Sequence, residues 1–478
     1  MTAAPLWSGL NLINATQARV SGSFAQAVHG VSIDTRTLQT GDLFTAIKGE
    51  NSDGHDYVRA AFAAGAAAAL VDESHADALK DAGPLFVVRE VLPALEGLGR
   101  AARARSGAGI IAVTGSAGKT GTKEMLRMAL SQAGETHASA ASYNNHWGVP
   151  LTLSRMPASA RFGVFEIGMN HPGEITPLVA MVRPHVAIVT TIAAVHLAQF
   201  DSLDAIAHAK AEIFSGLESN GVAIVNRDVP QYGILRAAAD ASRAGQTLTF
   251  GEHDKADARL VAVEQDGDSS IVTAWVLGAD IRYRIGAPGK HIAMNSLAVL
   301  LAGRAVGVEA QATAAALAAF SAPDGRGARQ KLFSPSGPYT LIDESYNANP
   351  ASMRAALGLL GSALPGPAGR RIAVIGDMLE LGPTGETLHA ELAPDAAANN
   401  VDLLFAAGPL SRALFAAPDE QRRARWTPAA AGLRDPLIAE IRAGDVVMIK
   451  GSNGSRMGPL VKALRDASEA LQSQARAS

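Results

Sequence analysis

The sequence predicts an α/β protein built from three domains. Its 478 residues exceed the size at which one hydrophobic core keeps growing, so more than one domain is expected. Short apolar runs alternate with helical patterns along most of the chain, which favours parallel sheets covered by helices. Changes in these local signals divide the chain into segments 1–106, 107–328 and 329–478.

The composition excludes several classes of protein. Hydrophobic residues make up 48% and charged residues 18%, as in an ordinary globular protein. A formal net charge of −3 offers no basic excess for nucleic acid or an anionic membrane, so neither is an expected partner. The absence of cysteine excludes disulfides, thiolate nucleophiles and cysteine metal sites. Residues 1–10 do not have the pattern of a signal peptide, and a cytoplasmic protein is expected.

The first segment contains a small α/β pattern. We expect strands at Gly41–Ile47 and Leu85–Val88, and a helix around Tyr57–Ala64. The alanine-rich run Ala60–Val71 is about twelve residues long, too short for a membrane span of roughly 20, and is interpreted as a buried helix entering a strand. The helix Ala94–Arg105 then leads to a linker at 106–107.

The second segment begins with a strand at Gly109–Val113, a glycine-rich loop and a helix at Lys123–Gln132. The further apolar runs that we expect to join the same parallel sheet are Phe162–Ile167, Val186–Thr190 and Val222–Val225. From Thr247 to Ile285 short alternating strands with glycine turns predict an antiparallel edge.

The third segment begins after the Gly/Arg stretch Asp324–Arg329 and is a second α/β unit. Its predicted strands are Thr340–Asp343, Arg371–Ile375, Leu403–Phe405 and Val446–Ile449. The tail from Ser468 onward is expected to be frayed.

The most specific motif lies between the first strand and helix of the second segment. Its residues are Thr114, Gly115, Ser116, Ala117, Gly118, Lys119 and Thr120. Glycines there let backbone N–H groups face a phosphate, Lys119 would reach the terminal phosphates, and Thr120 would bind magnesium. Val113 stands where the standard P-loop has its first glycine, so this is a shortened variant. A chance Gly-Lys-Thr in a glycine turn is the alternative.

Three other positions could carry chemistry. Glu166 ends a buried strand, where ligands bind in open α/β sheets, and could be a metal ligand or a buried salt-bridge partner. His196 follows the next strand, and a structural histidine is an equally good interpretation. The paired asparagines Asn144 and Asn145 precede a glycine and a proline, which simple turn chemistry explains.

Lys210 lies in the helical stretch Ala205–Leu217, among apolar residues at helical spacing. If buried, it would have a depressed pKa and could react as a neutral amine. The alternative, which the sequence alone favours, is a surface lysine whose stem covers apolar neighbours.

Taken together, these motifs resemble the Mur ligase family over essentially the whole chain. The matching stretches are TGSAGKT at 114–120, YNNHWGVP at 143–150, EIGMNHPGEI at 166–175, His196, KAEIFSGL at 210–217, GKHIAMNSLAV at 289–299 and PDGRGARQ at 323–330. The stretches DESYNANPASM at 343–353, GDMLELG at 376–382 and KGSNGSRMG at 450–458 resemble the member that adds D-alanyl-D-alanine. Residues 32–57 resemble that family's uridine-nucleotide domain.

The resemblance implies a fold and a reaction. The three segments would be a small uridine-nucleotide domain, a central P-loop-type parallel sheet and a Rossmann-like domain that closes over ATP and binds the amine. ATP would activate the carboxylate of a UDP-N-acetylmuramoyl-tripeptide as an acyl phosphate, and D-alanyl-D-alanine would attack it. ATP and two magnesium ions are the implied cofactors, and a monomer is expected.

The resemblance also implies roles for individual residues. Gly115 to Thr120 would hold the ATP phosphates, and Lys119 would be catalytic. Thr120 and Glu166 would bind one magnesium ion, while His196 and a carbamylated Lys210 would belong to a second site. Further ATP contacts would come from Thr114, Asn295, Arg326, Asp343, Tyr346 and Asn347. The UDP-linked substrate would lie near Thr35, Arg36, Asp53, Gly54, His55 and Asn145.

Some positions depart from the family pattern, and some interpretations stay open. Ile292 replaces an asparagine of some relatives, and Gly121 replaces a hydroxyl residue. The stretch around 324–329 is long, so either Arg326 or Arg329 could contact the γ-phosphate. A folylpolyglutamate synthetase and a nucleotide switch or motor ATPase are the alternative functions. The 32–57 stretch and GDMLELG argue against the first, and the third α/β unit argues against the second.

Overall fold

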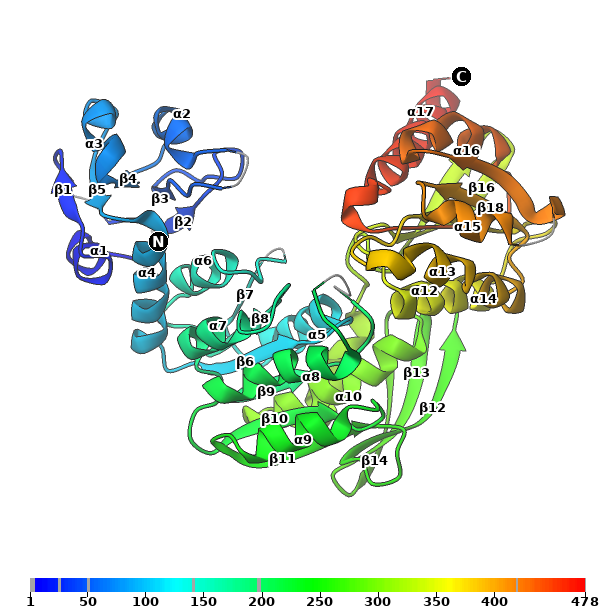
Figure 1. Cartoon of the computed structure of the whole chain (residues 1–478), viewed down its shortest axis with the longest axis horizontal. Coiled ribbons are helices and arrows are strands. Elements are labelled where there is room, and N and C mark those ends of the chain that lie inside the picture. The colour runs from blue at the N-terminus through cyan, green and yellow to red at the C-terminus, as the bar shows by residue number, and fades with distance from the viewer. Residues whose placement is uncertain are drawn as a thin grey trace.

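The computed structural model describes residues 5–24, 27–49, 52–139, 142–195, 199–417 and 420–477, with side chains to residue 474. Its strands form three separate sheets, one in each of three successive units. Figure 1 shows the N-terminal and C-terminal units standing apart at opposite ends of the central unit, which lies beneath and between them. The predicted three-part α/β fold is therefore confirmed. None of the helices in the described residues has the length and apolar character to cross a bilayer.

The N-terminal unit has a five-stranded sheet in the order β1-β5-β4-β3-β2, of which only the β1–β5 pair is antiparallel. Leu85–Val88 is buried at every position, which matches its continuous apolar sequence. The strands are β1 (Arg19–Ser21), β2 (Gly30–Ser32), β3 (Asp42–Thr45), β4 (Ala68–Asp72) and β5 (Leu85–Val88). The helices are α1 (Gly9–Thr16), α2 (Val58–Ala63), α3 (Glu73–Leu79) and α4 (Val91–Arg105).

Helix α4 anchors the N-terminal unit on the central one. Its Arg103 donates 2.8 Å hydrogen bonds to the carbonyls of Val182 and Arg183, and its Arg105 lies over the ring of Trp7 at 3.8 Å. Trp7 in turn donates from its indole nitrogen to the carbonyl of Ser154. These polar contacts hold the end of the predicted linker helix against the central unit.

The central unit has a nine-stranded sheet in the order β14-β13-β12-β11-β10-β9-β6-β8-β7. Strands β7 to β12 pair in parallel and β12 to β14 form the antiparallel edge that the sequence predicts. Its strands are β6 (Gly109–Thr114), β7 (Thr136–Ala138), β8 (Phe162–Glu166), β9 (Val186–Val189), β10 (Gly221–Asn226), β11 (Ala244–Gly251), β12 (Ala258–Asp266), β13 (Ser269–Val276) and β14 (Ala279–Ile285).

Two apolar cores cover the faces of this sheet, one under α10 and α5 and the other under α7 to α9. The helices of the central unit are α5 (Lys119–Ser131), α6 (Gly148–Ser154), α7 (Ile175–Val182), α8 (Leu203–Ala211), α9 (Tyr232–Asp240), α10 (Lys290–Ala305) and α11 (Ala310–Ala316). Because β6, β8 and β9 are adjacent and parallel, their carboxyl ends meet at one edge, where the candidate site lies.

The C-terminal unit has a six-stranded sheet in the order β15-β16-β20-β17-β18-β19, antiparallel only between β15 and β16. Its strands are β15 (Ala328–Ser334), β16 (Gly337–Glu344), β17 (Arg371–Gly376), β18 (Leu403–Ala407), β19 (Arg423–Thr427) and β20 (Val446–Lys450). Its helices are α12 (Pro350–Ser362), α13 (Gly385–Ala390), α14 (Ala393–Ala398), α15 (Ser411–Ala416), α16 (Arg434–Glu440) and α17 (Gly458–Ala477).

Several predicted bounds differ from the structure: the helix predicted from Ala94 begins at Val91, and the strand predicted to end at Phe405 continues to Ala407. Two further predictions were also wrong. The tail from Ser468 is not frayed, because it continues α17, and the hydroxyl of Ser468 accepts a hydrogen bond from the backbone N–H of Phe333. The helix predicted from Lys123 begins one turn earlier, at Lys119. Its first residues include a glycine and two threonines, which are poor helix formers, so propensity alone places the start too late.

Candidate functional site

The loop between β6 and α5 has the backbone shape of an anion cradle. Gly115 and Gly118 have φ angles of +150° and +83°, which side chains other than glycine rarely adopt. A Cβ at Gly118 would lie 2.5 Å from the side-chain amide of Asn295, so this approach also requires glycine. Lys119 and Thr120 occupy the first turn of α5, where the helix N–H groups have no intrahelical acceptor.

Lys119 is held over this loop. Its ammonium donates a 2.6 Å hydrogen bond to the carbonyl of Gly115, four residues earlier. Burial and the positive charge of Arg326 lower the pKa of Lys119, while the nearby Glu166 opposes that shift. A cation that is shielded from solvent and only partly neutralised by neighbouring groups is suited to bind an anionic phosphate.

Glu166 lies at the carboxyl end of β8 and is buried, with 2% of its surface exposed. One of its oxygens accepts a 2.8 Å hydrogen bond from the hydroxyl of Thr120, and the other accepts one of 2.7 Å from the side-chain amide of Asn144. The carboxylate therefore belongs to a polar network. Among the described residues no cation forms a salt bridge with it, so the alternative of a buried salt-bridge partner was wrong. Asn144, considered earlier only as a turn residue, orients the carboxylate.

Lys210 is also buried, with 2% of its surface exposed, on α8. Burial, together with the charge of Lys119, lowers its pKa well below the ordinary value of a lysine. Within the described part of the chain no acceptor receives a hydrogen bond from its amine. The surface-lysine alternative was wrong, because apolar packing around α8 covers this side chain. His196 lies outside the described residues.

A cavity of about 510 Å³ lies between the central and C-terminal units, directly above this loop. Arg326 joins the two sides: its guanidinium lies 4.0 Å from the centre of the Tyr346 ring and donates a 3.2 Å hydrogen bond to the hydroxyl of Ser142. The sequence-predicted residues that line the cavity are Ser116, Ala117, Gly118, Lys119, Glu166, Asn295, Arg326, Tyr346 and Asn347.

The structure separates the two candidate arginines. Arg326 lines the cavity. Arg329, on β15, is not among the lining residues and instead pairs with Asp268 at 2.8 Å. Asp343 is also outside the lining: it is buried, accepts hydrogen bonds from Ser345 and pairs with Arg465 at 3.2 Å. Three other predicted phosphate-loop residues are not part of the cavity lining: Thr114, Gly115 and Thr120.

The lining includes polar residues that sequence reasoning missed. Glu344 follows Asp343 on β16 and faces the cavity in its place, because successive strand residues point to opposite faces. Lys450, at the end of β20, donates to Glu344 at 3.1 Å and to the carbonyl of Asn347 at 3.0 Å. Ser142 and His291 are among the other polar residues of the lining.

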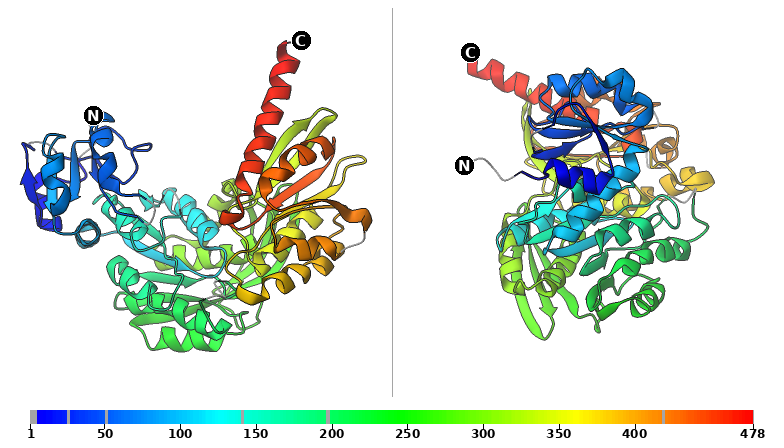
Figure 2. Two further views of the ribbon diagram at one scale, coloured as in Figure 1. Left: turned by 45° about the horizontal axis from the view of Figure 1, so that its top comes forward. Right: turned by 90° about the vertical axis from the view of Figure 1, so that its left-hand side faces the viewer.

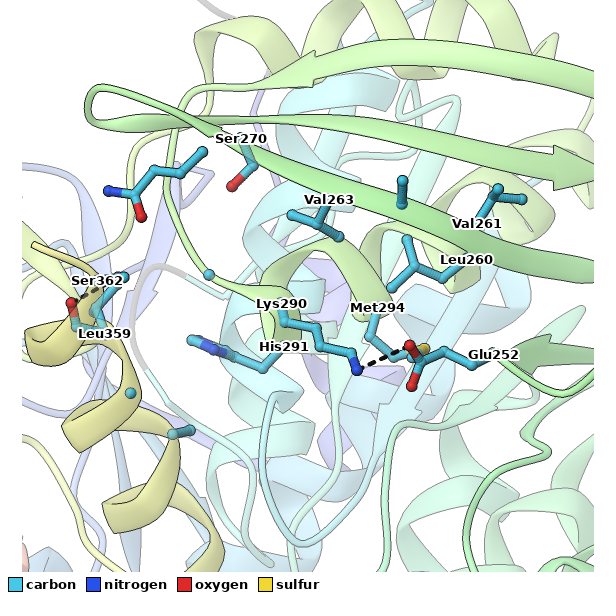
Figure 3. Close-up of a pocket in the computed structure, with 15 residues that line it drawn as sticks. Glu252, Leu260, Val261, Val263, Ser270, Lys290, His291, Met294, Leu359 and Ser362 are labelled. Atoms are coloured by element: carbon cyan, nitrogen blue, oxygen red, sulfur yellow. Dashed lines mark hydrogen bonds and ion pairs between the residues drawn. The ribbon is translucent and has the colours of Figure 1, made fainter. Parts of the chain in front are cut away.

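A second cavity, of about 790 Å³, adjoins the first at His291, Met294 and Ala355. In Figure 3 its wall is the apolar face of β12, and Lys290 reaches across its floor to Glu252, at 2.8 Å. The ring of His291 points away from that ion pair, toward α12. The two cavities together give an elongated ligand room to extend beyond the phosphate loop.

Five of the six predicted uridine-nucleotide residues lie in the N-terminal unit, and Asn145 lies in the central unit. His55 is buried, and its Nε2 accepts a hydrogen bond from the backbone N–H of Asp72, so its Nδ1 carries the proton and donates to Asp53 at 2.6 Å. Gly54 lies against the backbone of Ile47, where a Cβ would not fit. Asp53, Gly54 and His55 thus make contacts with one another, with Ile47 and with Asp72.

Three other residues of the predicted uridine-nucleotide set differ in exposure. Arg36 is exposed and pairs with Asp34, and Thr35 beside it is half-buried. Asn145 accepts a hydrogen bond from the backbone N–H of Gly148, which caps the start of α6. Arg36 is the most exposed charged residue of this set, and Asp53 is partly exposed. Contact of this set with a nucleotide stays a prediction.

Comparison with known proteins agrees with this geometry. Three family models match the chain: "Mur ligase family, catalytic domain" at residues 27–123, "Mur ligase middle domain" at 113–303 and "Mur ligase, glutamate ligase domain" at 328–453. The chain belongs to the Mur ligase family. The middle-domain match starts at the phosphate loop and includes Glu166, Lys210 and Asn295.

Curated relatives of this Mur ligase are named UDP-N-acetylmuramoyl-tripeptide--D-alanyl-D-alanine ligase. The Bacillus subtilis protein is 34% identical over 91% of this chain and 93% of its own length. The Escherichia coli protein is 35% identical over the same shares. A crystal structure of MurF from Acinetobacter baumannii superposes with a TM-score of 0.82 at 29% identity, covering 96% of this chain and 99% of that one.

Proposed function

We propose that this Mur ligase joins D-alanyl-D-alanine to a UDP-N-acetylmuramoyl-tripeptide with consumption of ATP. The observation that carries the proposal is the convergence of Lys119, Glu166 and Arg326 on one cavity beside an anion-binding loop. The relatives named for this reaction cover nine-tenths of the chain, which supports the choice of substrates. The uridine diphosphate would bind the N-terminal unit, and the amine would come from the C-terminal unit.

The chemistry requires activation of a carboxylate, which is a poor electrophile. The tripeptide carboxylate attacks the γ-phosphorus of ATP, forming an acyl phosphate and releasing ADP. The amine of the dipeptide then attacks the acyl carbon, and the tetrahedral intermediate loses inorganic phosphate to leave the amide. Lys119 and the loop N–H groups would hold the phosphates in line, and Arg326 would offset charge that builds up during transfer.

The donors near the loop fit a magnesium ion. The Thr120 hydroxyl and the Glu166 carboxylate are hard oxygen ligands only 2.8 Å apart, and Mg²⁺ prefers such ligands together with phosphate oxygens. When bound there, the ion would neutralise charge between the β- and γ-phosphates. Asn144 would keep the carboxylate oriented through its 2.7 Å hydrogen bond.

A second magnesium ion would need an oxygen ligand at Lys210, because an amine is a poor ligand for this metal. The buried amine, in its neutral form, could react with carbon dioxide, forming a carbamate and releasing one proton. The carbamate would supply the missing anionic oxygens. The burial of Lys210 and its lowered pKa support this step. His196 is the other proposed ligand of this site.

The test is an assay of ADP release by the purified chain with both substrates present or with either one left out. We expect one ADP per amide formed and almost no ADP without the dipeptide or the UDP-linked peptide. Tripeptides ending in lysine and in diaminopimelate would be tried in parallel. ATP hydrolysis that is indifferent to both substrates would favour a nucleotide switch, and ligation to a folate acceptor alone would favour a folylpolyglutamate synthetase.

A further inference from the structure

Helix α6 lies at the joint between the N-terminal and central units. In Figure 1 it is at the top of the central unit, beneath the N-terminal unit, and it contacts β2. The left view of Figure 2 shows the N-terminal unit, in blue, on the side of the central unit opposite the C-terminal unit, in orange and red. Every residue of α6 is buried, so the helix cannot shift without disturbing the packing around it.

The carboxyl end of α6 holds the N-terminal unit through two hydrogen bonds. Arg155, the residue that follows α6, donates from its Nε to the carbonyl of Val31 in β2 at 2.6 Å. The indole nitrogen of Trp7 donates to the carbonyl of Ser154 at 2.9 Å. Both bonds cross from one unit to the other, and both acceptors belong to buried residues. Together they fix β2 on the end of α6.

The guanidinium of Arg155 also lies near the segment that leads into α6. It is 5.8 Å from the centre of the Tyr143 ring, which in turn meets the Trp147 ring edge-on at 5.7 Å. Tyr143 directly precedes Asn144, the residue whose amide orients Glu166. Arg155 therefore lies between a strand of the N-terminal unit and the turn that leads to the phosphate site.

The predicted uridine-nucleotide residues lie at both ends of this connection. Thr35 and Arg36 follow β2, and the hydroxyl of Ser32, the last residue of β2, bonds to the main chain of Asp34, so this turn moves with the strand. Asn145 is at the other end, where its side chain caps α6. A nucleotide that contacts both groups needs them at a fixed separation.

We infer that Arg155 is a positioning residue, which sets the separation of these two groups by fixing β2 on α6. The inference rests on the proposed function, in which a UDP-linked peptide spans the N-terminal and central units. The uridine diphosphate anchors this substrate, while its carboxylate must meet the γ-phosphate of ATP in the central unit. Because a displacement of about 1 Å can lower a rate about 100-fold, the geometry of the joint should affect turnover.

The test compares Arg155→Met with the wild-type chain in the ADP-release assay, varying one substrate at a time. Methionine keeps an unbranched apolar stem but removes the donor to Val31. We expect kcat/KM for the UDP-linked tripeptide to fall about 10- to 100-fold, whereas the KM values for ATP and D-alanyl-D-alanine stay within about twofold of wild type. Arg155→Lys should recover part of the loss, because its ammonium can also donate. Arg161→Met is the matched control and should behave as wild type, since Arg161 donates to the carbonyl of Ala133 within the central unit.

A second probe removes the anchor from the substrate instead. N-acetylmuramoyl-tripeptide, which lacks the uridine diphosphate, should be a poorer substrate than the UDP-linked form for wild type. The Arg155→Met variant should lose less on this change, because its two groups of nucleotide contacts are no longer aligned. Trp7→Phe keeps an aromatic ring but removes the donor to Ser154, and it should lower kcat/KM for the UDP-linked tripeptide in the same way. Equal losses for wild type and Arg155→Met would overturn the inference.

A third measurement follows the joint itself. The chain has no cysteine, so two introduced cysteines can carry spin labels at chosen positions. Asp77→Cys in the N-terminal unit and Arg243→Cys in the central unit replace exposed residues, and electron paramagnetic resonance would give the distance between the labels. We expect Arg155→Met, but not Arg161→Met, to shift or broaden the distribution of that distance.

Two further outcomes would contradict the role of Arg155. An unchanged label distance would show that the residue does not hold the joint, and a lower unfolding temperature with unchanged kinetics would show that it only packs the units together. If wild type releases no ADP with the UDP-linked tripeptide and the dipeptide, the proposed function itself fails. The label distances do not depend on activity, so they separate that failure from a failure of the inference.

Discussion

The hydroxyl of Thr120 donates a 2.8 Å hydrogen bond to the carboxylate of Glu166, 46 residues further along the chain. The first residue lies in the opening turn of α5, which follows β6, and the second lies at the end of β8. The parallel sheet pairs β6 with β8, so the carboxyl ends of these two strands lie side by side. A sheet edge thus joins a phosphate loop to an acidic group. That pairing is the basis of the proposed magnesium site.

The Glu166→Gln variant should need more magnesium. It keeps the shape of the side chain and the hydrogen bond from Thr120, but it removes the negative charge that attracts the ion. The magnesium concentration for half-maximal ADP release should rise at least about 10-fold. Glu174→Gln in the following loop, where the carboxylate bonds to the backbone of Asn170, is the control. An unchanged magnesium requirement would contradict the proposed ligand.

Replacing Lys119 by alanine should abolish nearly all turnover. The ammonium lies over the loop and supplies charge that the phosphates need during transfer, so its loss should lower kcat by about 10³-fold or more. Lys80→Ala, an exposed lysine in the N-terminal unit, should leave the rate unchanged. Substantial ADP release by the Lys119→Ala variant would count against the assignment of this loop.

Lys210→Ala should also be nearly inactive, and a small carboxylate should restore part of its activity. The deleted side chain leaves a buried space in which acetate could supply the oxygens of a carbamate. Wild-type activity should in addition fall when dissolved carbon dioxide is removed and return when bicarbonate is added. Activity that is indifferent to carbon dioxide would contradict the carbamate but would leave the fold assignment intact.

Much of the fold could be predicted because the central strands are continuous apolar runs. Leu85–Val88 was placed without error, and Phe162–Glu166 and Val186–Val189 to within one residue. Edge strands carry weaker signals. Arg19–Ser21 and Arg423–Thr427 are short, contain arginine and are partly exposed. Neither therefore has the continuous apolar sequence that predicts a buried strand.

The prediction of the site was most accurate where its residues are consecutive in the sequence. The phosphate loop carries its chemistry in seven consecutive residues, and its glycine conformations agree with the motif. The environment of Lys210 could not be predicted, because its burial depends on helices that pack from other parts of the sequence. Asp343 was predicted where the structure has Glu344. The two acids are adjacent, and only the orientation of the strand decides which one faces the cavity.

The two arginines near the domain junction should behave differently. Arg326→Gln should lower kcat/KM for ATP about 10- to 100-fold, because the guanidinium lines the cavity and stacks on Tyr346. Arg329→Gln should change that ratio less than about threefold, since its partner is Asp268 rather than a cavity residue. Steady-state kinetics on both variants would decide, and equal losses would reopen the choice between them.

Acid should weaken the C-terminal unit through His389. This imidazole is buried, its Nδ1 donates to the carbonyl of Gly385 at 2.6 Å, and its Nε2 accepts from the N–H of Met378 at 2.9 Å. Burial lowers the pKa of His389 from its ordinary value of 6.5, although Gly385 and Asp377 oppose the shift. The native ring therefore stays neutral at a pH where the unfolded chain already takes up a proton.

The sign of this effect follows from proton linkage. Because the unfolded state binds more protons below pH 6.5, the free energy of unfolding falls as the pH drops from 6.5 toward the native pKa. His389→Gln should be less stable than wild type near pH 7.5 but should lose less stability on going to about pH 5.5. Thermal unfolding midpoints at both pH values, with hydrogen exchange at Met378, would measure it, and the exposed His29→Gln variant is the control. Equal pH dependence in wild type and His389→Gln would show that the unfolding transition does not depend on this buried imidazole.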